Sequence, residues 1–264
     1  MQLVTIVTKK QDGPIDPRPE FQGGLNWFEE RVIRNRERIL APYGLTDNFV
    51  RMSPNHEDEI AVVDEESLER WRGKLLAGRP EVDALVTNLP NIGLECLPAD
   101  CGVYAIFHEE LGWLGMAHAG REGSIVKVLE KTIRRMAELS GTKMEIFIKG
   151  LKIWMAPAIC GKHYLKEYIE IPKKDLEEWK PFILGEKEIV DAGENYKIKA
   201  KDKSIGIDFV GFNCQQLLNC GLKSEQLDLS EVCTFESEDY FSSYRDKIAE
   251  VVQGRFMVMV MMKP

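Results

Sequence analysis

The sequence lacks the features of several large classes of protein. It contains no run of about 18 apolar residues, the length that spans a bilayer, and its first residues have neither the charged start nor the apolar core of a signal peptide. Basic residues are in the minority, with 35 Lys and Arg against 43 Asp and Glu. Because nucleic-acid binding requires a concentrated basic surface, this balance argues against a nucleic-acid partner. We expect a cytoplasmic protein with no membrane partner that acts on a small molecule; the sequence leaves the oligomeric state open.

Common cysteine motifs are also missing. The six cysteines form no C-x-x-C pair and show no regular close spacing; they are Cys96, Cys101, Cys160, Cys214, Cys220 and Cys233. Neither a closed zinc finger nor a disulfide framework is therefore expected. Any metal site would have to be assembled from distant parts of the chain.

Short apolar strands and amphipathic helices are intermingled along the whole chain. Helical periodicity predicts helices over residues 27–40, 64–76, 124–139 and 208–220. Strand-like segments are predicted at 3–7, 49–52, 60–63, 83–87, 103–107, 113–117, 145–149, 153–155, 232–234 and 256–262. No repeat or linker interrupts this pattern, so we expect one mixed α/β (α+β) domain spanning residues 1–264.

Residues 97–123 carry the clearest chemical signal. Two strands flank a polar turn at 108–112, which predicts a β-hairpin with His108 exposed in its turn. If the turn is centred on Glu109 and Glu110, Cys101 falls directly opposite His118. Opposed Cβ atoms lie roughly 5 Å apart, so the thiol and the imidazole could bind one metal ion.

The same residues carry a resemblance to a known family. Ala99-Asp100-Cys101 and His118-Ala119-Gly120 resemble the A-D-C and H-A-G signatures of the YfiH-like family. Members of that family carry the labels laccase-domain protein, multicopper polyphenol oxidoreductase, peptidoglycan-editing factor and purine nucleoside phosphorylase. Further matches, in the same order along the chain, include Asn35-Arg36, His56, the 156–164 segment, Asp208, Asn213, Cys233-Thr234, Tyr244-Arg245 and Gly254-Arg255.

The resemblance implies a fold of layered, mixed β-sheets flanked by helices. It also implies one metal ion, usually zinc, held by His56, Cys101 and His118, which would then be the catalytic centre. The implied activity is on purine nucleosides, by phosphorolysis or deamination. Copper-dependent oxidation of polyphenols and the editing of a cell-wall precursor are the alternatives that other family labels suggest. We take Arg36, Arg121, Arg245 and Asn26 as candidate substrate-binding residues.

Two histidines and one cysteine would leave a fourth tetrahedral position open, as in catalytic zinc sites. Zinc lowers the pKa of bound water to about 7, which suits an attack on a purine carbon. The same ligands also suit copper. Four histidines in the whole chain are too few for a trinuclear copper cluster, so only a single copper ion would be compatible with the sequence.

The segment after His-Ala-Gly departs from the family pattern. The family usually continues with W-R-G, whereas this chain has Arg121-Glu122-Gly123. An acid at position 122 would repel phosphate unless Arg121 supplies the missing cation. Pro54 and Glu57 also replace the usual residues around His56, so a weakened member that only binds a ligand or a partner is a further alternative.

Two other residues are left with open or modest roles. His163 is either a base close to the site or a helix cap. Cys233 is expected only to pack in the core.

Overall fold

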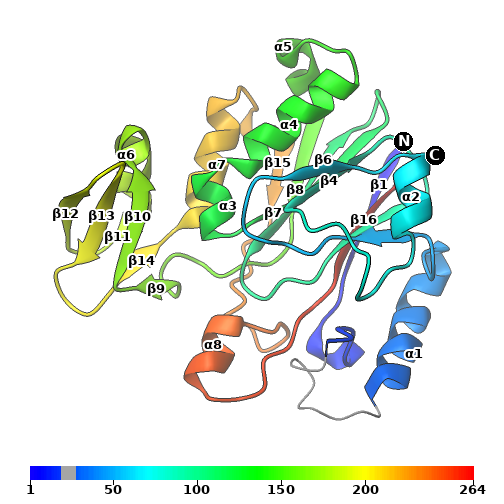
Figure 1. Cartoon of the computed structure of the whole chain (residues 1–264), viewed down its shortest axis with the longest axis horizontal. Helices are drawn as coiled ribbons and strands as arrows, with labels where there is room; N and C mark the ends of the chain where they lie inside the picture. Colours follow the sequence, from blue (N-terminus) through cyan, green and yellow to red (C-terminus); the bar gives the residue numbers. More distant parts are fainter. Residues whose placement is uncertain (19–27) are drawn as a thin grey trace.

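The structure is a computed structural model that describes residues 1–18 and 28–264 (Figure 1). Its helices are α1 (Phe28–Leu40), α2 (Glu65–Trp71), α3 (Arg121–Ile125), α4 (Val128–Leu139), α5 (Met144–Phe147), α6 (Leu176–Trp179), α7 (Phe209–Asn219) and α8 (Ser243–Ile248). Among the described residues, none of the helices combines the length and the apolar character required to cross a membrane.

Most strands belong to two sheets. A six-stranded sheet has the order β15-β8-β6-β7-β4-β3, and a four-stranded sheet has the order β1-β16-β5-β2. Their strands are β1 (Gln2–Val7), β2 (Phe49–Arg51), β3 (Ile60–Val62), β4 (Ala84–Thr87), β5 (Gly93–Cys96), β6 (Gly102–His108), β7 (Trp113–Ala119), β8 (Leu151–Met155), β15 (Leu227–Leu229) and β16 (Val258–Lys263). Both sheets mix parallel and antiparallel pairs.

The two sheets stack face to face and helices cover their outer faces. Alternate side chains of each strand point to opposite faces, so Val103 and Ala105 of β6 enter the apolar layer between the sheets, while Tyr104 and Ile106 pack under α4. Outside the four-stranded sheet, Leu40 of α1 packs into a separate cluster. The resulting order is helix, sheet, sheet, helix, which confirms the predicted mixed α/β fold of layered sheets flanked by helices.

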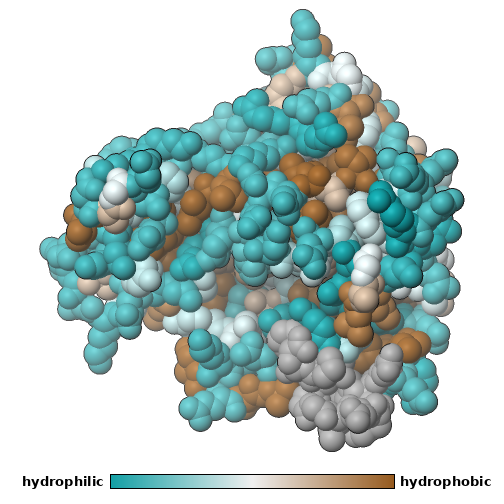
Figure 2. All heavy atoms as spheres, in the orientation of Figure 1, coloured by the Kyte–Doolittle hydropathy of each residue, from teal (hydrophilic) through white to brown (hydrophobic). Residues whose placement is uncertain are grey.

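Two small sheets stand beside this body (Figure 1). One has the order β10-β13-β12 and the other β11-β14-β9. Their strands are β9 (Leu165–Lys166), β10 (Tyr168–Pro172), β11 (Ile183–Leu184), β12 (Lys187–Ala192), β13 (Asn195–Ala200) and β14 (Ile205–Ile207). A separate apolar cluster that includes Trp179 and Phe212, whose rings stack with centroids 3.8 Å apart, joins them to α7. On the face drawn in Figure 2 the surface is mostly hydrophilic, consistent with the apolar side chains being used in these clusters.

Four local predictions are wrong. The expected strand over 232–234 is only an isolated bridge between Cys233 and Ala158. The expected helix over 124–139 is two helices, because Lys127 adopts a left-handed conformation (φ 59°) between α3 and α4. The expected strand over 145–149 is helix α5 followed by a 3-10 turn, since a short apolar run has no periodicity that distinguishes the two. His108 ends β6 and is only 4% exposed, because its ring packs on Phe147 of α5.

Candidate metal centre and adjoining pocket

The hairpin of β6 and β7 carries two of the candidate ligands. Val103 pairs with His118 and Gly102 with Ala119, so the turn is centred one residue later than predicted and Cys101 lies at the level of Gly120. The direct pairing of Cys101 with His118 was therefore wrong. Because side chains alternate between faces, this shift of two positions leaves both residues on the same face as diagonal neighbours.

Gly120 makes room for the thiol. A Cβ atom built on Gly120 would lie 2.6 Å from Sγ of Cys101, well inside van der Waals contact. Any side chain at position 120 would therefore displace Cys101. This gives a physical reason for the glycine in the His-Ala-Gly motif.

The loop between β2 and β3 brings His56 to the same place. The ring centroids of His56 and His118 lie 5.3 Å apart, and the rings are nearly perpendicular. Ligand atoms of His56, Cys101 and His118 all lie within 4.8 Å of one another. His118 is buried, Cys101 is half-buried and His56 is exposed, so the cluster opens to solvent on the His56 side.

Asp83, at the entrance to β4, organises this cluster, and the sequence reading missed it. Its Oδ1 lies 2.8 Å from Nδ1 of His118, while its Oδ2 accepts hydrogen bonds from the backbone N–H groups of Asn55 and Glu57 on either side of His56. One buried carboxylate thus orients one imidazole and holds the loop that carries the other. A carboxylate on the second nitrogen of a histidine ligand is common in metal sites. The only signal in the sequence was an acid at the start of a buried strand.

The backbone is strained at one residue of the cluster, His56, and at Asp100, which directly precedes Cys101 in the chain. His56 has φ 66° and Asp100 has φ 92°, a region that residues other than glycine rarely adopt. The Asp100 carboxylate is held by Oγ1 of Thr234 at 2.7 Å and by the N–H of Tyr244 at 2.7 Å. Such strain persists where the surroundings over-determine it, as they commonly do at functional sites.

The electrostatics favour a thiolate at Cys101. Burial opposes its ionisation, but the positive charge of His118 and hydrogen bonds from His118 and His56 outweigh burial and lower the pKa of Cys101 to about 7. Burial likewise opposes the charged form of His118, yet Cys101 and Asp83 raise its pKa to about 10. Without a metal, the cluster therefore holds a thiolate beside an imidazolium. A divalent cation could replace the proton on His118 and keep the thiolate.

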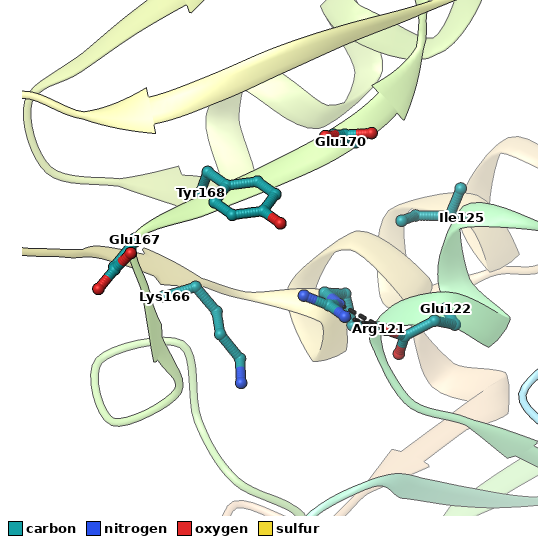
Figure 3. A pocket seen from close by; sticks show the side chains of 7 residues that line it. All are labelled: Arg121, Glu122, Ile125, Lys166, Glu167, Tyr168 and Glu170. Carbon is teal, nitrogen blue, oxygen red and sulfur yellow. Dashed lines mark hydrogen bonds and ion pairs between the residues drawn. The ribbon is translucent and has the colours of Figure 1, made fainter.

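A pocket of about 520 Å³ lies beside the cluster, between α3 and the start of β10. Figure 3 shows its lining side chains: Arg121, Glu122, Ile125, Lys166, Glu167, Tyr168 and Glu170. Burial lowers the pKa of Lys166, and the nearby charge of Arg121 lowers it further. The charges of Glu122 and Cys101 act in the opposite sense on the pKa of Lys166.

Arg121 and Glu122 are paired with each other. Nε of Arg121 donates to Oε1 of Glu122 at 2.8 Å, and a terminal nitrogen of Arg121 contacts the same oxygen. Burial raises the pKa of Glu122, but the hydrogen bond and the charge of Arg121, with smaller contributions from a backbone hydrogen bond and from His56, together lower it. The acid that replaces the family arginine is therefore partly neutralised by its neighbour.

The other candidate substrate-binding residues lie elsewhere. Arg36 is buried, and its two terminal nitrogens each lie 2.7 Å from an oxygen of Glu95. Arg245 donates to the carbonyl groups of Thr234, Phe235, Ser237 and Tyr240. These contacts give both arginines a structural role, so we do not include them among the proposed substrate-binding residues. Asn26 lies outside the described residues.

Comparisons with known proteins agree with the motifs. The family model described as multi-copper polyphenol oxidoreductase laccase matches residues 28–263. The chain belongs to this family. The resemblance read from the A-D-C and H-A-G motifs is thereby confirmed.

Curated relatives in the family are named as enzymes. A purine nucleoside phosphorylase of Streptomyces coelicolor is 30% identical over 224 residues, covering 84% of this chain and 81% of the relative. A purine nucleoside phosphorylase of Campylobacter jejuni is 26% identical over 251 residues, covering 92% of this chain and 90% of the relative.

Solved structures share the family fold. YlmD from Geobacillus stearothermophilus has a TM-score of 0.72 and 20% identity, covering 99% of this chain and 92% of that one. The Bacillus licheniformis hypothetical protein YfiH has a TM-score of 0.73 and 20% identity, covering 99% and 93%. At this level of identity the likeness establishes the fold alone.

Proposed function

We propose that this chain is a metal-dependent enzyme acting on purine nucleosides, with His56, Cys101 and His118 as the metal ligands and the catalytic centre. The observation that carries the proposal is the convergence of three donor atoms within 4.8 Å of one another, with Asp83 bonded to one of the two imidazoles. The names of the curated relatives suggest the substrate class.

The donor set fits zinc. Two imidazole nitrogens and one thiolate are ligands that zinc accepts, and three protein ligands are typical of its catalytic sites. The 2.8 Å contact between Asp83 and Nδ1 of His118 leaves Nε2 as the nitrogen free to coordinate. Copper accepts the same atoms, so the metal has to be identified by measurement. A zinc ion bound here would supply Lewis-acid polarisation of a substrate or water molecule at its open position.

The pocket residues support a nucleoside that reacts with an anion. Arg121 and Lys166 bring two positive charges to a pocket that is also lined by Glu122, Glu167 and Glu170, and a phosphate group would have to bind on the side of the two cations. Arg121 thus provides the cation that the family places at the next position. In this arrangement Glu122 positions Arg121 and also discourages a second anion, while Tyr168 offers an aromatic face at the rim of the pocket.

These features favour phosphorolysis over deamination. In phosphorolysis a phosphate oxygen bonds to C1′ of the sugar, the glycosidic bond to the purine breaks, and the base leaves with the bonding electrons and takes up a proton. The protein would have to bind the phosphate and hold it against the sugar, and two adjacent cations suit that task. Deamination needs no phosphate and would leave Arg121 and Lys166 without such a role.

The test combines metal analysis with substrate assays. In protein purified without a metal-affinity tag, Cys101→Ala should lower the zinc content by about one equivalent relative to the wild type. Copper lost in place of zinc would favour the alternative of a polyphenol oxidoreductase. The enzyme is then incubated with adenosine and with inosine, each with and without phosphate. Release of free base only with phosphate supports phosphorolysis, and ammonia release without phosphate indicates deamination. If no nucleoside reacts, the chain is a binding protein or acts on another substrate.

A further inference from the structure

A second cluster of metal-ligand side chains lies on the other side of Asp100. The turn between β8 and β9 carries Cys160 and His163, and the segment after β15 carries Cys233. Ligand atoms of these three residues all lie within 4.8 Å of one another. Sγ of Cys160 is 3.2 Å and Sγ of Cys233 is 3.7 Å from Nδ1 of His163. His163 therefore lies in a different cluster from the one predicted. Cys233 packs in an apolar cluster, as expected, and its thiol is one of the three donors.

A fourth donor is within reach. Oε1 of Glu236 lies 3.6 Å from Nδ1 of His163, on the exposed side of the cluster. Around a tetrahedral zinc ion with ordinary bond lengths, neighbouring donor atoms are separated by about 3.3 to 3.8 Å. The three distances measured from Nδ1 of His163 all fall close to that range. Glu236 is not among the residues whose donor atoms all lie within 4.8 Å of one another, so its exposed side chain would have to turn toward the thiols to complete a closed, four-coordinate site.

The backbone holds these donors in place. Ala158 and Cys233 form a parallel β-bridge, and the N–H of Cys160 donates to Sγ of Cys233 at 3.4 Å. The N–H groups of His163 and Tyr164 both donate to the carbonyl oxygen of Cys160, which makes a tight turn. The imidazole of His163 stacks on Phe235, with ring centroids 4.7 Å apart and an interplanar angle of 10°. A site whose ligands are already ordered loses little entropy when it binds an ion.

We propose that Cys160, His163 and Cys233, with Glu236 as the fourth ligand, form a second, structural zinc site. Soft thiolate ligands in a tetrahedral arrangement select zinc among the common divalent cations. Both cysteines would bind as thiolates, and the two thiol protons would be released to solvent as the two bonds to zinc form. The proposed site does not rest on the nucleoside activity proposed above, because among the described residues none of its four ligands lines the pocket or belongs to the first cluster.

The second ion would stabilise the segment that precedes Cys101. The carbonyl oxygen of Asp100 accepts a hydrogen bond from Ile159, next to Cys160, and its carboxylate accepts one from Thr234, next to Cys233. A zinc ion joining Cys160 to Cys233 would tie together the two segments that hold Asp100 in its strained conformation. The site thus acts as a cross-link within the fold.

The experiment measures zinc content by mass spectrometry in protein purified without a metal-affinity tag. We expect about two equivalents in the wild type and one in Cys101→Ala. Adding Cys160→Ser to the Cys101→Ala variant should remove the remaining equivalent. Cys214→Ser is the matched control: this half-buried cysteine lies on α7 outside both clusters, and its replacement should leave two equivalents.

A milder variant keeps the test decisive if Cys160→Ser does not fold. In the Cys101→Ala background, Glu236→Gln replaces an exposed side chain. It should weaken binding of the remaining ion by at least about tenfold, because loss of a residue that only hydrogen-bonds to a metal ligand already costs about that much. Affinity is measured by competition between added Zn²⁺ and a chromophoric chelator. Cobalt substituted at this site should show a thiolate-to-metal absorption band that Cys160→Ser abolishes.

Three results would overturn the proposal. One is a Cys101→Ala protein that holds no zinc and takes up none during the titration. Another is a disulfide between Cys160 and Cys233, detected as two missing free thiols in protein alkylated at lysis. The third is zinc binding that Glu236→Gln and Cys160→Ser both leave unchanged.

Discussion

The two clusters use the same kinds of donor atom in opposite proportions. The first has two imidazoles and one thiol, with a buried carboxylate behind His118 and an exposed His56 in front. The second has two thiols and one imidazole, with the carboxylate of Glu236 on its open side. His118 of the first cluster is followed directly in the chain by α3, which lines the pocket. A metal ion with three protein ligands has a fourth coordination position open to a substrate, whereas a metal ion with four protein ligands has none.

The same difference appears in the thiols. Cys101 lies between two histidines, and its pKa is lowered to about 7. Burial and the neighbouring thiol of Cys233 raise the pKa of Cys160 above its usual value of 9.0. A thiol ionises readily when its neighbours are cationic, and less readily when its neighbour is another thiol. The thiol of Cys101 can therefore ionise near neutral pH without a metal ion, whereas the thiol of Cys160 would need the positive charge of a bound metal ion to ionise at that pH.

The strongest test of this contrast is activity. Cys101→Ser should lower kcat/KM for a purine nucleoside by at least about 100-fold, because several kcal/mol of metal-dependent stabilisation would be lost. Cys233→Ser should lower it by less than about tenfold, through weaker support of Asp100 alone. Steady-state kinetics on both variants, with zinc content measured in parallel, provide the check. Equal losses would mean that the two clusters do not have separate roles.

Replacement of Asp83 should change the zinc affinity of the first cluster but not that of the second. Asp83→Asn keeps the size of the side chain but removes the charge behind His118, so zinc at the first cluster should bind about 10 to 100 times more weakly. At the second cluster the carboxylate near His163 is Glu236 rather than Asp83, so the affinity of that cluster should not change in Asp83→Asn. Chelator competition on Asp83→Asn and on Asp83→Asn combined with Cys160→Ser separates the two sites. Unchanged affinity at the first cluster would show that Asp83 acts only on the fold.

Alkylation of the metal-free protein compares the thiols directly. Because the folded pKa of Cys101 is lowered, its thiolate forms as the pH rises through about 7. The pKa of Cys160 is raised by burial and by the neighbouring thiol of Cys233, so its thiolate forms at higher pH than that of Cys101. At pH 7, iodoacetamide should therefore modify Cys101 about tenfold faster than Cys160, even allowing for the weaker nucleophilicity of a low-pKa thiol. Peptide mass spectrometry over a pH series measures both profiles; coincident midpoints would contradict the contrast.

The smallest effect concerns the pocket. Glu122→Arg adds the cation that the family usually has at this position, and phosphate-dependent turnover should rise by a few-fold, since an extra charge-assisted contact to phosphate becomes possible. Glu122→Gln is the control that removes the acid without adding a cation. Phosphate titrations on both variants give the KM for phosphate. No change in either would show that phosphate does not approach position 122.

Much of the first cluster could be read from the sequence. The A-D-C and H-A-G motifs marked Cys101 and His118, and alternation along strands kept them on one face even though the predicted register was wrong. The loop position of His56 between two strands was also predicted. Asp83 could not be found in this way, because an acid that starts a buried strand looks the same whether or not an imidazole faces it.

The second cluster shows the same limit more strongly. Cys160 and Cys233 are 73 residues apart, and the sequence suggested no reason to pair them. Their meeting depends on the β-bridge between Ala158 and Cys233, which is a contact between two irregular segments. Long-range contacts of this kind leave no periodic pattern in either segment.

By itself, the sequence determined the family, the layered α/β fold and the order of the motifs, because hydrophobic periodicity and local residue chemistry act over a few positions. Tertiary structure alone decided which distant groups meet: Asp83 with His118, Arg121 and Lys166 in one pocket, and His163 with two thiols. It also decided that His108 is buried and that Arg36 faces Glu95. The physical reason is that pKa values, ion pairs and ligand geometry depend on distances of a few ångströms between residues that the chain itself keeps far apart.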